Sequence, residues 1–129
     1  MIRRKKQNKK VLIVEDDALL LRVLSEIFSS EGFEIATVEN GLEVVDLVKN
    51  FSPDIILLDL IIPGIDGFAV LKQLKANETT KKIPVVILSN LEDVGDIKSG
   101  KVLGADEYFI KANIEVSKIV DYVKKKLKV

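Results

Sequence analysis

Short apolar runs alternate with longer segments of helical periodicity along this chain. Five aliphatic runs have the length and composition of strands buried on both faces of a sheet. They are VLIV (11–14), EIATV (34–38), DIILL (54–58), PVVIL (84–88) and EYFI (107–110). After each run, apolar residues recur every three or four positions, which is the spacing of an amphipathic helix. The pattern therefore predicts five strand–helix units.

The helical segments carry recognisable ends. The apolar stripe of the first consists of Leu19, Leu20, Val23, Leu24, Ile27 and Phe28. Gly32 closes that segment, and Asn40 with Glu43 has the spacing of a capping box at the start of the second. The remaining helices are expected over 67–75, 92–103 and 114–127.

Strands that alternate with helices form a parallel sheet with helices on both faces. Because crossovers are right-handed, few topologies remain, and we predict an α/β fold whose doubly wound, five-stranded parallel sheet has the order 2-1-3-4-5. The 129 residues show no break in composition and fit a single domain. Ligands of such sheets bind at the carboxyl ends of the strands, beside strands 1 and 3.

Composition narrows the chemistry. The chain has no cysteine and no histidine, which excludes disulfides, thiolate nucleophiles, zinc–sulfur sites and the commonest general base. A metal would have oxygen ligands, which favours magnesium, calcium or manganese. No stretch has the length of a transmembrane span or of a signal-peptide core, so we expect a cytoplasmic protein with no membrane partner.

Charge is unevenly distributed along the chain. Although the formal net charge is zero, residues 1–10 contain six basic side chains and no acidic one. No aromatic residue is interleaved with these bases, so we expect a disordered basic leader over 1–10 and no nucleic-acid partner for the domain over 11–129.

Carboxylates follow the first and third predicted strands. Strand 11–14 ends in Glu15, Asp16 and Asp17, and strand 54–58 is followed by Asp59. Neighbouring strands lie about 4.8 Å apart, so Asp59 is expected to face Glu15 and Asp16. Two carboxylates 4 Å apart repel by about 4 kcal/mol at an effective dielectric of about 20. Mg²⁺ is the natural counter-ion, and we interpret Asp17 as the N-cap of the first helix.

Two more polar residues follow strands of the same sheet. Ser89 comes after strand 84–88 and Lys111 after strand 107–110, so both are expected at the edge that carries the acids. Carboxylates for a metal, a carboxylate nucleophile, a hydroxyl and a fixed cation are the groups that phosphoryl transfer requires. A carboxylate can itself take the phosphoryl group as an aspartyl phosphate.

From Val11 to about Leu127 the sequence resembles the receiver domain of two-component response regulators, which has a flavodoxin-like fold. The resemblance rests on motifs at five places in register. They are the acid pair Glu15 and Asp16, a D-x-x-x-P-x-x-[DG]-G frame (Asp59, Pro63, Asp66, Gly67), Ser89, Tyr108 and Lys111.

The resemblance implies that Asp59 is a phosphoacceptor that attacks a phosphohistidine on a sensor histidine kinase or a phosphotransfer protein. It implies Mg²⁺, or Mn²⁺, bound by Glu15, Asp16, Asp59 and the backbone carbonyl of Ile61. Lys111 would pair with Asp59 and then with the phosphoryl group. Such a protein catalyses only its own phosphorylation and dephosphorylation and is not otherwise an enzyme.

Ser89 and Tyr108 are implied as switch residues. Ser89 would turn to the phosphoryl oxygen and Tyr108 would move inward, reshaping the face made by the fourth helix, fifth strand and fifth helix. An effector protein or a second copy of the chain would bind that face. Gly95 and Gly100 each cost about 1 kcal/mol relative to Ala in a helix, so we expect the fourth helix to be the soft element that responds.

Two positions depart from the family pattern. Asn90 follows the serine where a small residue is usual, and Ala112 follows the lysine where proline is usual, often with a cis bond, which could place Lys111 differently.

The alternative function is that of a degenerate receiver that acts as an unphosphorylated interaction module. An aspartyl phosphatase is disfavoured because it would need a second acid at position 61, where this chain has Ile. A flavin or nucleotide carrier is disfavoured because it would need a glycine-rich phosphate loop after a strand. The chain is expected to be a stand-alone receiver or a fragment of a longer regulator.

Overall fold

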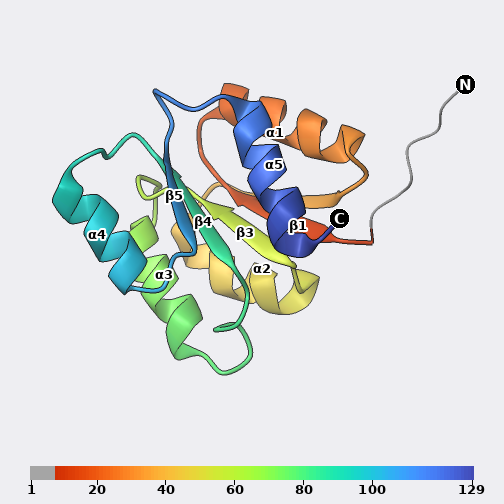
Figure 1. The fold of residues 1–129 in the computed structure, drawn as a ribbon. Coiled ribbons are helices and arrows are strands. Elements are labelled where there is room, and N and C mark those ends of the chain that lie inside the picture. The colour runs from red at the N-terminus through yellow and green to blue at the C-terminus, as the bar shows by residue number, and fades with distance from the viewer. Residues whose placement is uncertain (1–7) are drawn as a thin grey trace, which may run out of the picture.

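The computed structural model describes residues 8–129 and contains one five-stranded parallel sheet (Figure 1). Its order is β2-β1-β3-β4-β5, which confirms the predicted fold and topology. The strands are β1 (Lys10–Val14), β2 (Glu34–Val38), β3 (Ile55–Leu58), β4 (Val85–Ser89) and β5 (Glu107–Ile110).

Helices cover both faces of the sheet. They are α1 (Ala18–Ser30), α2 (Val44–Phe51), α3 (Gly67–Ala76), α4 (Val94–Val102) and α5 (Val116–Leu127), with a short 3-10 turn, η1 (Gly41–Glu43), before α2. In Figure 1, α1 and α5 lie on one face, and α2, α3 and α4 lie on the other. No helix within residues 8–129 is long and apolar enough to cross a membrane.

The central strands are apolar on both faces because each face packs against helices. Leu12 and Val14 of β1 point into the core beneath α2, α3 and α4. Val11 and Ile13 point into the core beneath α1 and α5. All four are at most 1% exposed. This double burial explains why β1 has an unbroken aliphatic sequence and fixes the position of the acids that follow it.

The structure differs from the prediction in one residue of the first helical stripe and at several element ends. Leu19 is 72% exposed rather than part of the buried stripe, because it lies about 100° around α1 from Leu20, which faces the core. The second helix begins at Val44 after η1, and the Asn40 side chain caps that turn by accepting a hydrogen bond from the Leu42 N–H.

The last two helices are shorter than predicted, since α4 begins at Val94 and α5 at Val116. Of the predicted leader over 1–10, residues 1–7 lie outside the described part of the chain. Lys10, its last residue, already pairs with Glu34 in the sheet.

Candidate functional site

The carboxylates that follow β1 and β3 lie side by side. Val14 is in register with Leu58, and the parallel pairing extends one residue further, since the Asp59 N–H donates to the Val14 carbonyl. The Glu15 N–H likewise donates to the carbonyl of Val38 at the end of β2. Backbone hydrogen bonds to neighbouring strands therefore position both acids.

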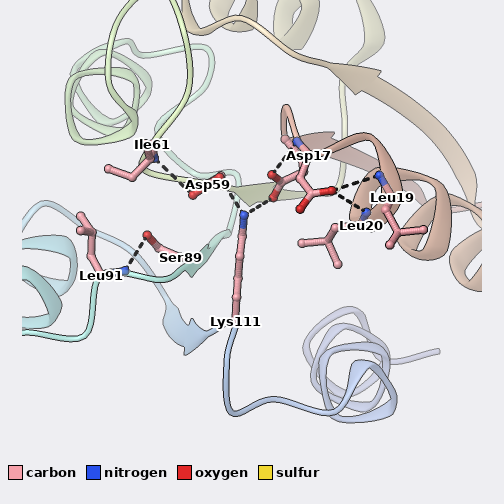
Figure 2. Close-up of polar contacts among 9 residues, drawn as sticks. Asp17, Leu19, Leu20, Asp59, Ile61, Ser89, Leu91 and Lys111 are labelled. Atoms are coloured by element: carbon pink, nitrogen blue, oxygen red, sulfur yellow. Dashed lines mark hydrogen bonds and ion pairs between the residues drawn. The ribbon is translucent and has the colours of Figure 1, made fainter.

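One oxygen from each of Glu15, Asp16 and Asp59 lies within 4.8 Å of the others. Glu15 and Asp59 are only 2% and 4% exposed, whereas Asp16 is open to solvent. The Asp17 carboxylate turns away and accepts hydrogen bonds from the N–H groups of Leu19 and Leu20 (Figure 2). Asp17 is thus the predicted N-cap, and the other three acids form the cluster.

Lys111 forms ion pairs with both buried carboxylates of this cluster. Its Nζ lies 2.8 Å from Asp59 Oδ2 and 2.7 Å from Glu15 Oε2, and its side chain is 15% exposed. Figure 2 shows the lysine extended towards Asp59 from the end of β5. No cis peptide bond occurs among the described residues, so the backbone at Ala112 is trans and Lys111 still reaches the acids.

Burial and the contacts with Lys111 act in opposite directions on the pKa values of this site. Burial, reinforced by the charge of Asp59, raises the pKa of Glu15 above its usual range, while the hydrogen bond from Lys111 opposes this change. Burial on its own would lower the pKa of Lys111, but the hydrogen bonds to Asp59 and Glu15 outweigh it and raise that pKa. The lysine therefore remains a cation at neutral pH.

Ser89 and Tyr108 both hydrogen-bond to the backbone of Leu91. The Leu91 N–H donates to Ser89 Oγ at 3.2 Å, and the Tyr108 hydroxyl donates to the Leu91 carbonyl at 2.6 Å. Ser89 is fully buried and Tyr108 is 8% exposed, so the tyrosine is already in an inward position. Burial also raises the pKa of the Tyr108 hydroxyl, which remains a hydrogen-bond donor at neutral pH.

A hollow of about 340 Å³ opens beside the acids and is lined in part by Ile61, Asn90 and Lys111. The Ile61 N–H donates to Asp59 Oδ1 at 3.2 Å (Figure 2). Three convergent carboxylates, one of them exposed, fit an oxygen-preferring divalent cation, and the chain has no histidine or cysteine that could add a nitrogen or sulfur ligand. This acidic pocket could therefore bind such a cation.

Six of the seven predicted site residues follow the strands or end them at their carboxyl ends. The seventh, Tyr108, is the second residue of β5, and its hydroxyl reaches the loop after β4. Sequence reasoning did not identify the Lys111–Glu15 ion pair, although the placement of both residues at one edge could have indicated it. It also missed Leu91, which takes part through its backbone and has no signature in the sequence.

Comparison with known proteins agrees with this arrangement. The family model for the response regulator receiver domain matches residues 11–124. Sporulation initiation phosphotransferase F of Bacillus subtilis is 38% identical over 120 residues, which cover 93% of this chain and 94% of that protein. The DNA-binding response regulator MtrA of Mycolicibacterium paratuberculosis is 35% identical over 102 residues, covering 79% of this chain but only 44% of MtrA.

A solved structure gives the same result. The phosphorylated cyanobacterial phytochrome response regulator RcpA superimposes with a TM-score of 0.79 at 32% identity, covering 92% of this chain and 91% of RcpA. The fold, the matched residues and the cluster of acids with one lysine agree, and the chain belongs to the response regulator receiver domain family.

Proposed function

We propose that Asp59 is the phosphoacceptor of this receiver and takes its phosphoryl group from a phosphohistidine on a sensor histidine kinase or a phosphotransfer protein. The observation that carries the proposal is the environment of Asp59, a buried carboxylate 2.8 Å from the Lys111 ammonium within a cluster of three acids. The relative RcpA was solved in a phosphorylated form, which supports the same chemistry here.

In this reaction an Asp59 carboxylate oxygen forms a bond to phosphorus. The phosphorus–nitrogen bond of the phosphohistidine breaks, and its electron pair stays on the imidazole nitrogen. Phosphoryl transfer depends mainly on positioning and on neutralising charge, and Lys111 supplies a fixed positive charge at the accepting oxygen. The Ile61 N–H holds the other Asp59 oxygen and so orients the carboxylate.

Glu15, Asp16 and Asp59, with the backbone carbonyl of Ile61, would hold Mg²⁺ or Mn²⁺. The cation would neutralise part of the charge on the phosphoryl oxygens. The exposed Asp16 carboxylate leaves the cluster accessible to a hydrated ion, which suits Mg²⁺ because it keeps several waters.

The response to phosphorylation would pass through Leu91. If Ser89 turns its hydroxyl to the phosphoryl group, it gives up the hydrogen bond from the Leu91 N–H. The carbonyl of the same residue accepts a hydrogen bond from the Tyr108 hydroxyl. Movement of Leu91 would change the start of α4 and its packing against β5, and so the face made by α4, β5 and α5. An effector protein or a second copy of the chain would recognise the altered face.

The proposal is tested by the intact mass of the protein after incubation with acetyl phosphate, with Mg²⁺ or with EDTA, for wild type and Asp59→Asn. One phosphoryl adduct that requires Mg²⁺ and is absent from Asp59→Asn is the expected result. Folded wild-type protein that never gains an adduct would contradict it and would identify a degenerate receiver that acts by binding alone.

A further inference from the structure

The loop between β3 and α3 is held from outside by the turn that follows β2. The Gly41 N–H donates to the Pro63 carbonyl at 2.9 Å, which joins the start of η1 to the middle of the loop. The Asn40 side chain lies over Gly64 while its Oδ1 accepts the Leu42 N–H at 2.8 Å. Two segments more than 20 residues apart in sequence are therefore in direct contact.

This contact leaves no room for a side chain on either glycine. A Cβ on Gly41 would lie under 3.0 Å from the backbone oxygen of Ile65. Gly64 has a φ of +90°, and its Cβ would lie under 3.0 Å from the Asn40 side chain. The turn and the loop fit each other at both positions, and at Gly41 the obstacle is backbone, which cannot rotate aside.

The loop held in this way is the one that carries the groups around Asp59. Its base is closed by a hydrogen bond of 2.8 Å from the Gly67 N–H to the Leu60 carbonyl. Ile61 lies between this hydrogen bond and the contact at Pro63, and its N–H donates to Asp59 Oδ1. Ile61 is two residues from Pro63, so a shift at Pro63 reaches the Asp59 carboxylate through two peptide groups.

We propose that Asn40 and Gly41 are positioning residues for the acceptor site. They keep the loop seated so that the Ile61 N–H stays on Asp59 and the Ile61 carbonyl stays available to the cation. This inference rests on the proposed function of Asp59. A displacement of a few tenths of an ångström is sufficient to matter, because a misplacement of about 1 Å can reduce catalysis by about 100-fold.

The test compares Gly41→Ala and Asn40→Ala with wild type in two measurements. The first is the rate of adduct formation from acetyl phosphate at saturating Mg²⁺, and the second is the dissociation constant for Mn²⁺ alone, measured by electron paramagnetic resonance. We expect both variants to react at least tenfold more slowly and to bind Mn²⁺ at least threefold more weakly. Asn40→Asp, which keeps an oxygen acceptor for the Leu42 N–H, should restore both values.

Two control variants separate positioning from general loss of stability. Gly95→Ala adds a methyl group with no atom within 4 Å apart from its chain neighbours and the backbone of its own helix. Thr80→Ala removes a buried hydroxyl that donates to the Leu74 carbonyl, at the amino ends of the strands. Both controls should react and bind Mn²⁺ like wild type, although Thr80→Ala should unfold at lower urea.

The inference is overturned if Asn40→Ala, which adds no atom and should fold, keeps the rate and the Mn²⁺ affinity of wild type. It is also overturned if Thr80→Ala loses as much rate and Mn²⁺ affinity as Gly41→Ala and Asn40→Ala, since the effect would then be one of stability. If wild type gains no adduct, the proposed function fails, and the Mn²⁺ affinities alone test the positioning role of Asn40 and Gly41. Equal affinities for wild type and Asn40→Ala would refute that role.

Discussion

Removal of the Lys111 ammonium should destabilise the domain and make its stability depend on pH. Lys111→Met keeps the length of the side chain but leaves Glu15 and Asp59 buried without their shared cation. Their oxygens lie within 4.8 Å, which corresponds to a repulsion of about 3.5 kcal/mol at an effective dielectric of about 20. Loss of one partner of a buried ion pair typically costs about 3–5 kcal/mol. We therefore expect the free energy of unfolding to fall by about 3–4 kcal/mol at pH 7 without metal.

The dependence on pH has a defined sign. The pKa of Glu15 is already raised, mainly by burial, and loss of the lysine removes the hydrogen bond that opposes this change. A carboxyl whose pKa is higher in the folded state binds its proton more tightly there, so protonation favours folding. The deficit of Lys111→Met relative to wild type should therefore shrink as the pH falls from 7 towards the usual Glu pKa of 4.5.

Urea unfolding followed by circular dichroism in EDTA measures these differences. Lys118→Met, which replaces an exposed lysine of α5, is the matched control and should unfold like wild type. Adding Glu15→Gln to Lys111→Met removes one of the two charges and should restore part of the loss. A deficit of Lys111→Met below about 1 kcal/mol, or one that grows as the pH falls, would refute the electrostatic explanation.

Three further predictions concern the helices and the metal. Gly95→Ala should raise the free energy of unfolding by about 0.4–1 kcal/mol. Gly100→Ala should lower it by about 1 kcal/mol, because the added Cβ would lie 2.7 Å from Ile87 Cδ1. Equal effects of the two variants in urea unfolding would contradict this prediction. Asp17→Ala should cost about 1 kcal/mol through the lost cap, and Asp93→Ala clearly less, since Asp93 makes no side-chain cap hydrogen bond; similar losses would argue against capping. Mg²⁺ at 100 times its dissociation constant should stabilise wild type by about 2.7 kcal/mol, and unchanged urea midpoints up to saturation would contradict a metal site.

The sheet was predictable because its central strands are buried on both faces. Runs such as IILL in β3 have no alternation to misread, and the acids after β1 and β3 then had to meet at one edge. The predicted ends of two strands differ from the observed ends by one residue, since β1 begins at Lys10 and β4 continues to Ser89. Strand ends are set by backbone hydrogen bonding, which here includes the polar residues Lys10 and Ser89.

Contacts made by backbone or by the absence of a side chain were not predictable. The softness of α4 stays a prediction, but the sequence does not indicate that Gly100 is buried against Ile87 and Tyr108 and lets the helix approach the sheet closely. Leu91 contributes two backbone groups to the hydrogen bonds of Ser89 and Tyr108. Neither role depends on a polarity or a spacing that a sequence pattern can reveal.

The most direct test of the account is the location of the phosphoryl group in the chain. Protein phosphorylated with acetyl phosphate and Mg²⁺ would be reduced with borohydride, which converts an aspartyl phosphate to homoserine, and its peptides would be sequenced by mass spectrometry. The account predicts homoserine at position 59 and at no other acid. Homoserine at Asp16, or an adduct that resists borohydride, would contradict the assignment of Asp59 as the phosphoacceptor.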